Sequence, residues 1–489
     1  IEEGYRQDFP DIVLKDHQKT HFNNIIKILK DNKGFIDASP TGSGKTFTTL
    51  AIAKTLVLKL FVICPPITIE NWKKTCETYG IEYIDMISYS SLRSVKDHQP
   101  KNDFLYKDDS SSKRPKFIIK NNFLEVIKKN NILLVLDEAQ NLKNDCIQFD
   151  ACRELCRHVS TTGSKFCLLS GSLFDKKRHV FQFLNLFDLI PSLNIDEITF
   201  DQLIPFLTLC ASINKEETKK YFKNQEDLSR KELVEVVYEL FVNVLRLKLF
   251  SSMPPPTELF MKSIRKGFFK TTDEDSKNIN RNVNMLCKSL GFKDDDDIES
   301  DKKNLQSVTK CLENLEFSKK NIFVDKAKSI LRSNKSNKLI ICLNYKKIQS
   351  LIYQELSEFE PLLINGETAL MIRNEYIYKF QNNDKYRLII MSTSISVGIN
   401  LHDLQGNKPR YMLISPTHSI LNIHQAAGRV VRCDTKSNVE IYLVFSSGAK
   451  KESSVINCLT RKTTILNELH KEQVENGIIF PGDYDEFYE

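Results

Sequence analysis

The stretch from Phe35 to Thr46 constrains the fold of this chain more than any other part. A short apolar run leads into a turn with two glycines and then into a helix-forming segment. Such a turn aims successive backbone N–H groups inward, where they cradle nucleotide phosphates, while a lysine reaches the β- and γ-phosphates and a hydroxyl ligates Mg²⁺. The residues expected to bind the nucleotide are Thr41, Gly42, Ser43, Gly44, Lys45 and Thr46. The alternative is a chance loop with two glycines and a lysine.

An acidic pair follows the apolar run Ile132–Leu136, which is typical of a strand buried on both faces. Open parallel sheets bind ligands at the carboxyl ends of such strands. Asp137 can hold Mg²⁺ through its water shell, and Glu138 can polarise the water that attacks the γ-phosphate. Taken alone, such a pair more often caps a helix. Together with the phosphate loop, it indicates a site that hydrolyses a nucleoside triphosphate.

A chain of 489 residues is too long for one hydrophobic core. Strand and helix patterns alternate over residues 1–195 and again over 322–489, so we expect two α/β parallel-sheet domains. Residues 196–321 have helical periodicity and predict a helical insertion, whereas the polar residues 96–116 predict a mobile surface insertion. Gln18, upstream of the phosphate loop, is a candidate for reading an adenine edge.

Composition favours a soluble globular protein, with 41% hydrophobic residues and no apolar run that approaches a membrane span. The first residues do not resemble a secretory signal. A net charge of +7 permits a polyanionic partner without demanding one. The twelve cysteines lack any Cys-x-x-Cys pair, which favours free thiols in a reducing compartment. The spacing of Cys152 and Cys156 fits one face of a helix better than a zinc site.

Several segments resemble motifs of the Swi/Snf branch of superfamily 2 helicases. The run from Asp137 to Asn144 resembles motif II, although Gln140 replaces the commoner His. The other segments of the first half are Pro65 with Asn71-Trp72 for motif Ia, Ser88-Tyr89 for motif Ib and Ser170-Gly-Ser172 for motif III.

The second half resembles the remaining motifs. Residues Ser392–Leu401 resemble motif V and His424–Arg432 resemble motif VI, with Cys433-Asp434 in place of the usual Gly-Gln. Arg429 and Arg432 are three residues apart, so we expect them to share a helix face and to act as arginine fingers. The resemblance adds Gly398 and Gln425 to the nucleotide-binding residues. It places nucleic-acid backbone contacts near Pro65, Ser88, Ser394 and Ile395.

The resemblance implies two RecA-like domains at 1–195 and 322–489, the second with a C-terminal tail, and ATP held between them with Mg²⁺. It implies an ATP-dependent translocase or helicase that acts on DNA, with duplex DNA as the expected form, and that has no membrane partner. An RNA helicase and a nucleotide-gated scaffold stay as alternatives, and protein partners are left open. The expected location is intracellular, in the cytoplasm, the nucleus or the virion of a large DNA virus.

Overall fold

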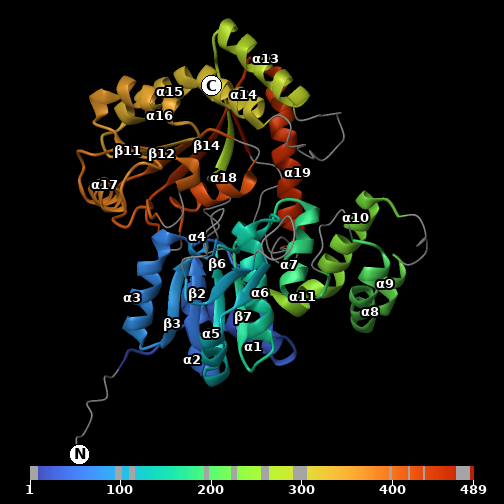
Figure 1. Ribbon diagram of the computed structural model, residues 1–489. Coiled ribbons are helices and arrows are strands. Elements are labelled where there is room, and N and C mark those ends of the chain that lie inside the picture. The colour runs from blue at the N-terminus through green and yellow to red at the C-terminus, as the bar shows by residue number, and fades with distance from the viewer. Residues whose placement is uncertain are drawn as a thin grey trace, which may run out of the picture. The chain divides into compact units, whose positions relative to one another are not determined.

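The computed structural model describes residues 9–93, 102–108, 116–191, 198–221, 228–254, 264–289, 305–395, 399–416, 419–432, 435–469 and 485–488. The chain divides into two compact units (Figure 1). Unit 1 is Ile1–Pro254 with Glu468–Lys471, and unit 2 is Pro255–Asn467 with Glu472–Glu489. Each unit contains one large parallel sheet, which confirms the predicted fold class.

The six strands of unit 1 follow the order β3-β2-β6-β7-β1-β8, and every adjacent pair is parallel. Because every adjacent pair is parallel, the chain must cross over between successive strands, and helices make these connections. The strands are β1 Gly34–Asp37, β2 Lys59–Cys64, β3 Tyr83–Ser88, β6 Ile132–Asp137, β7 Lys165–Leu169 and β8 Phe250–Ser251.

Both faces of this sheet are buried, as the continuous apolar runs predict. Along β2, Leu60, Val62 and Cys64 share a core cluster with residues of α1, α2 and α3. The intervening Phe61 packs on the rings of Phe104 and Phe123. The helices of unit 1 are α1 Asp16–Asp31, α2 Lys45–Leu56, α3 Ile69–Tyr79, α4 Tyr89–Leu92, α5 Asn121–Lys129, α6 Ile147–Ser160, α7 Val180–Leu186, α8 Ile204–Ile213, α9 Lys215–Lys219, α10 Arg230–Leu240 and α11 Arg246–Leu249.

Part of the predicted surface insertion at 96–116 is ordered into an antiparallel pair of strands, β4 Leu105–Asp108 and β5 Lys116–Ile119. Phe104 and Leu105 are buried, and the aromatic ring of Phe104 packs on that of Phe61. Residues 94–101 and 109–115 lie outside the described residues. The polar composition of the segment concealed the two apolar residues that anchor it.

The seven strands of unit 2 follow the order β11-β12-β10-β13-β14-β9-β15 and are also parallel. Leu339, Ile341 and Leu343 of β10 share a core cluster with α15 and α16. The strands are β9 Ile264–Phe269, β10 Lys338–Leu343, β11 Leu362–Ile364, β12 Leu388–Ser392, β13 Arg410–Ile414, β14 Val439–Ser446 and β15 Asp485–Tyr488. The helices are α13 Asp273–Ser289, α14 Leu305–Ser318, α15 Lys320–Ser333, α16 Lys346–Glu355, α17 Leu370–Asn382, α18 Ile420–Ala427 and α19 Ser453–Leu469.

The segment 196–321, predicted as a helical insertion, is divided between the units. Its helices α8 to α11 and strand β8 belong to unit 1, whereas β9, α13 and α14 belong to unit 2. Strand β9 pairs with β14 on one side and with β15 on the other, so the C-terminal tail contributes a strand as well. The boundaries at 195 and 321 stay predictions, and the compact units divide at 254.

Candidate active site

The phosphate loop connects β1 to α2, as the sequence predicts. Gly42 and Gly44 adopt positive φ angles of 84° and 95°, which favour glycine. A Cβ atom at Gly44 would lie 2.2 Å from the side-chain nitrogen of Gln18. The Lys45 ammonium donates to the main-chain oxygens of Ser39 (2.8 Å) and Pro40 (3.2 Å), so it reaches back across the loop.

Gln18 lies on α1, is buried, and contacts this loop directly. Its Nε2 donates to the carbonyl of Ser43 at 3.0 Å, and its Oε1 accepts from the backbone N–H of Lys15 at 2.9 Å. The side chain therefore links the start of α1 to the phosphate loop. Its role in reading adenine stays a prediction.

A buried network beneath the loop was not singled out from the sequence. His21 Nε2 lies 3.0 Å from Asp37 Oδ2, and both side chains are 1% exposed. Asp37 Oδ1 accepts from the backbone N–H of Ser39 at 2.9 Å, and Ser39 Oγ accepts from the N–H of Met253. Burial alone would raise the pKa of Asp37, but His21 and Lys45 hold it below its usual value. Ser39 therefore uses its hydroxyl to connect the loop to the segment after β8.

The acidic pair stands at the carboxyl end of β6. Asp137 Oδ1 accepts from the backbone N–H of Glu138 at 3.0 Å. Burial, helped by the neighbouring Glu138, raises the pKa of Asp137 to about 6, although Trp72 and Lys45 oppose the rise. Glu138 adopts a left-handed backbone conformation with φ 54° and ψ 51°, which is uncommon for a residue with a Cβ atom.

Two aromatic residues donate hydrogen bonds to Asp137. The indole Nε1 of Trp72, on α3, lies 2.9 Å from Oδ2. The hydroxyl of Tyr89, on α4, donates to the Asp137 main-chain oxygen at 2.8 Å. Both side chains are buried. In the sequence analysis, Trp72 and Tyr89 are only parts of motifs, and the strand order that brings them to Asp137 is not visible in the chain order.

Gln140 also belongs to the site, although the sequence marked it only as a departure from the family pattern. Its Nε2 donates to Glu138 Oε2 at 2.7 Å, and its Oε1 accepts from Ser170 Oγ at 2.6 Å. The side chain thus joins Glu138 to the segment Ser170-Gly-Ser172. Gly171 approaches the phosphate loop so closely that a Cβ atom there would lie 2.9 Å from the Ser39 oxygen.

The donor atoms fit Mg²⁺, which prefers carboxylate and hydroxyl oxygens together with phosphates and water. Asp137 contributes a carboxylate on which Lys45 acts electrostatically, because the Lys45 charge opposes the rise in pKa that burial causes. Thr46 contributes a half-buried hydroxyl at the first turn of α2. These are the two residues that would hold the metal.

The predicted nucleic-acid contacts in unit 1 lie at strand ends. Pro65 follows β2, and Ser88 ends β3, where its Oγ accepts from the N–H of Ser91 at 3.2 Å and caps α4. In unit 2, Ser394 is exposed and its Oγ lies 2.9 Å from that of Ser392, while the backbone of Ile395 ends a short 3₁₀ helix. Gly398 lies outside the described residues.

One detail of the arginine prediction is wrong. Helix α18 ends at Ala427, so Arg429 and Arg432 lie beyond it and share no helix face. The chain tightens into turns in which Arg429 N–H donates to Ala426 at 3.0 Å, and the Arg429 carbonyl accepts from the N–H of Leu401 at 2.8 Å. This bond ties the predicted motif VI to the end of motif V. Gln425 is buried within α18.

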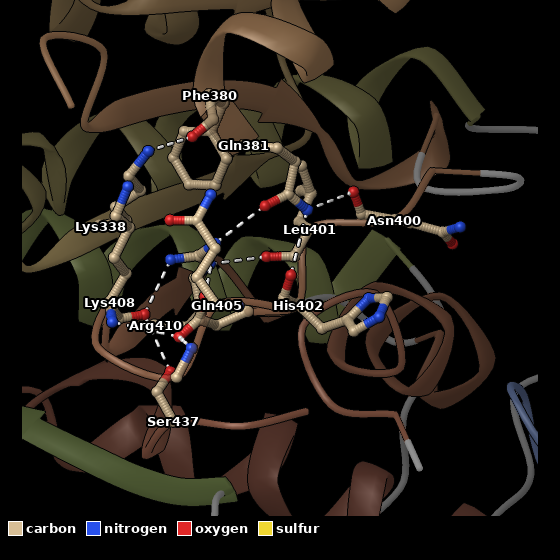
Figure 2. Close-up of polar contacts among 12 residues, drawn as sticks. Lys338, Phe380, Gln381, Asn400, Leu401, His402, Gln405, Lys408, Arg410 and Ser437 are labelled. Atoms are coloured by element: carbon tan, nitrogen blue, oxygen red, sulfur yellow. Dashed lines mark hydrogen bonds and ion pairs between the residues drawn. The ribbon is translucent and has the colours of Figure 1, made fainter. Parts of the chain in front are cut away.

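A buried arginine contacts the end of motif V (Figure 2). Arg410, 1% exposed, donates to the carbonyls of Leu401 and Lys408 and to Gln381 Oε1, each at 2.8 Å. Gln381 in turn donates to the carbonyls of Asn400 (2.9 Å) and His402 (3.1 Å). Figure 2 shows these side chains converging on the loop of residues 400–402. Arg410 and Gln381 therefore hold the end of motif V in place.

Comparisons with known proteins follow the division into two halves. Residues 11–166 match the family model of the type III restriction enzyme res subunit, and residues 322–434 match the helicase conserved C-terminal domain. A protein of Acanthamoeba polyphaga mimivirus, named putative ATP-dependent RNA helicase, is 25% identical over 95% of this chain and 86% of its own length.

Among solved structures, the Sulfolobus solfataricus SWI2/SNF2 ATPase core in complex with dsDNA is 17% identical, covering 96% of this chain and 95% of that chain. Its TM-score of 0.31 is too low to support an argument about fold or substrate. Among the described helices, none combines the length and hydropathy that a bilayer span requires. The two matched models cover more than half of the chain and correspond to its two α/β units. The chain therefore belongs to helicase superfamily 2 and is an ATP-hydrolysing enzyme.

Proposed function

We propose that this ATPase uses hydrolysis to move along nucleic acid, and that its preferred track is duplex DNA. The observation that carries the proposal is the placement of the motifs at the carboxyl edges of two parallel sheets. Asp137 is the last residue of β6 in unit 1, and Glu138 follows it. Ser392 is the last residue of β12 in unit 2. Ligands bind at this edge of parallel sheets, so each unit presents one motif set where a ligand can reach it.

The proposed chemistry divides among the residues of unit 1. Lys45 supplies a positive charge for the β- and γ-phosphates, and Glu138 accepts a hydrogen bond from the attacking water. Gln140 holds one Glu138 oxygen at 2.7 Å, which fixes the direction of the carboxylate. Asp137 and Thr46 would hold Mg²⁺, which would supply positive charge to the phosphates.

We propose Arg429 and Arg432 of unit 2 as donors to the charge that develops on the phosphate. Their backbone is fixed to motif V through the bond from Leu401 to Arg429. A nucleotide that engages both motif sets would couple its hydrolysis to a rearrangement of motif V, and so to the backbone contacts proposed at Ser394 and Ile395.

Preference for DNA is supported by the resemblance of residues 137–144 and of Asn71-Trp72 to the Swi/Snf branch. A protein that steps on phosphates needs no contact with base edges, so we propose no target sequence. Its affinity should fall steeply with salt, because phosphate contacts release counterions from the duplex. The second candidate is an RNA helicase, which the name of the mimivirus relative favours.

The deciding experiment measures ATP hydrolysis at fixed salt with equal nucleotide concentrations of duplex DNA, single-stranded DNA and RNA. Strand displacement is measured in parallel, and Lys45→Ala protein serves as the inactive control. We expect duplex DNA to stimulate hydrolysis most, with little strand separation. Stimulation by RNA alone would establish the RNA helicase instead. No stimulation by any polymer would favour a nucleotide-gated scaffold.

A further inference from the structure

Asp137 is the meeting point of three adjacent strands of unit 1. Strand β2 pairs with β6 on one side and β3 on the other, and all run in the same direction. Their carboxyl ends therefore share one edge of the sheet. The segments that leave this edge after β2 and β3 each return an aromatic side chain to Asp137, Trp72 from α3 and Tyr89 from α4.

The same two segments begin at the proposed nucleic-acid contacts. Pro65 directly follows β2, and a single 3₁₀ turn separates it from α3. Ser88 directly precedes Tyr89 and caps the helix that carries it. A displacement of the segment at Pro65 or at Ser88 would therefore move a residue that is hydrogen-bonded to Asp137. At most one 3₁₀ turn separates either segment from the helix that carries this residue.

We infer that Trp72 and Tyr89 are positioning residues that transmit nucleic-acid binding at the Pro65 and Ser88 segments to the carboxylate of Asp137. The inference rests on the proposed function. Trp72 fixes Oδ2 and the Glu138 N–H fixes Oδ1, so both carboxylate oxygens already have one donor. Tyr89 fixes the main chain of the same residue. Together they set the direction in which Asp137 presents its remaining lone pairs to a metal ion.

The packing of Trp72 strengthens this assignment. Its ring is 1% exposed and belongs to the core cluster under α1, α2 and α3, so the indole has little freedom of its own. A shift of α3 must then carry the N–H group along, because well-packed interiors transmit displacement. Partners of metal ligands typically change metal affinity or activity by about 10–100-fold when removed.

The test uses full-length protein with Trp72→Phe and Tyr89→Phe, which keep the aromatic rings and remove the donors. Tyr79→Phe on α3 is the matched control, since it removes a hydroxyl from the same helix. Three quantities are measured: the Mg²⁺ concentration for half-maximal binding of a fluorescent ADP analogue, the affinity for duplex DNA, and the stimulation of hydrolysis by that DNA.

Trp72 also provides a direct signal, because it is the one tryptophan of the chain. We expect its fluorescence to change when Mg²⁺ is added to protein saturated with ADP, and again when duplex DNA is added. In Tyr89→Phe protein the fluorescence change caused by DNA should shrink, and the change caused by Mg²⁺ should still occur but require a higher Mg²⁺ concentration.

The expected result for Trp72→Phe is about a 10-fold rise in the half-saturating Mg²⁺ concentration and a several-fold loss of stimulation, with DNA affinity within about twofold of wild type. Unchanged Mg²⁺ binding in both variants would overturn the positioning role. If the stimulation of hydrolysis by DNA falls only in proportion to the DNA affinity, the proposed transmission from the Pro65 and Ser88 segments to Asp137 is refuted. If no polymer stimulates the wild type, the proposed function fails with the transmission step, and the Mg²⁺ arm still decides the positioning of Asp137. Trp72→Phe could unfold the protein. If circular dichroism shows a loss of folded structure in this variant, the conclusion rests on Tyr89→Phe.

Discussion

The two units support their candidate sites in different ways. In unit 1 the bonds are aimed at the reactive groups: Trp72 donates to the Asp137 carboxylate and Gln140 to the Glu138 carboxylate. In unit 2 the supporting side chains Arg410 and Gln381 bind main-chain carbonyls at residues 400–402 and 408. Unit 1 therefore fixes the directions of side chains, and unit 2 fixes the path of a loop. Substitutions should accordingly alter chemistry in unit 1 and loop structure in unit 2.

The largest effect is expected for the arginines of unit 2. They are the exception to this contrast, because we assign them to the chemistry. Arg429→Ala or Arg432→Ala should lower kcat by roughly 10³–10⁵ for the arginine that stabilises the transition state, and much less for one that only orients. Arg332→Ala is the control, since Arg332 is an exposed arginine of unit 2 paired with Glu358. Steady-state hydrolysis and calorimetric melting check both. Near-normal kcat in both variants would remove unit 2 from the chemistry.

Glu138→Gln tests unit 1 in the same terms. The variant keeps the shape of the side chain and loses the charge that polarises water, so kcat should fall by roughly 10²–10⁴. ATP affinity and Mg²⁺ dependence should stay near wild type, because Asp137 and Lys45 are untouched. Rapid-quench and equilibrium binding measurements separate the two quantities. An equal loss of affinity and turnover would contradict the assigned division between Asp137 and Glu138.

Arg410→Met tests whether the hydrogen bonds from Arg410 to the loop stabilise unit 2. The change leaves Asp403, 1% exposed and 3.8 Å away, without its cationic neighbour and removes three donated hydrogen bonds. Breaking a buried charge pair costs roughly 3–5 kcal/mol, so unit 2 should melt early. Gln381→Ala should lower the free energy of unfolding by less than Arg410→Met does. It should lower the stimulation of hydrolysis by DNA more than it lowers the basal rate of hydrolysis. A wild-type melting curve for Arg410→Met would refute this structural role.

The smallest expected effect is the response to acid. Burial lowers the pKa of His179 in unit 1 and of His424 in unit 2 to about 3. Because the folded pKa lies below the unfolded value near 6.5, their contribution is complete above about pH 6.5 and is lost as the pH falls toward 3. Between pH 7 and 5 each histidine should remove about 2 kcal/mol of stability.

Urea unfolding at the two pH values, followed by probes in each unit, measures this loss. His179→Gln and His424→Gln should each flatten the pH dependence of the unit that contains the substitution. A pH dependence unaffected by either change would show that other groups govern acid sensitivity. Equal flattening of both units by one variant would show that the units unfold together.

The local features of the site were predictable from the sequence, because each depends on residues close together in the chain. The glycine turn of the phosphate loop and the apolar run before Asp137 are of this kind. The aromatic contacts to Asp137 were not predictable, since they depend on β2 lying between β3 and β6. Strand β9 was missed because its partners β14 and β15 lie far along the chain.

The arginine segment shows a different limit. The spacing of Arg429 and Arg432 fits a helix, and the residues before them do form one. The helix ends at Ala427, directly before Gly428, and the Arg429 carbonyl accepts from the N–H of Leu401. The spacing of the two arginines took account of neither the glycine nor this long-range hydrogen bond, which periodicity alone does not reveal.

The backbone of Glu138 has a consequence for engineering this enzyme. A left-handed conformation costs a glutamate roughly 1 kcal/mol or more, whereas asparagine and glycine tolerate it. Glu138→Asn should therefore raise the melting temperature slightly while removing the carboxylate beside Asp137. A directed-evolution campaign that scores thermal tolerance alone would enrich this inactive variant, so each round of selection needs a readout of ATP turnover.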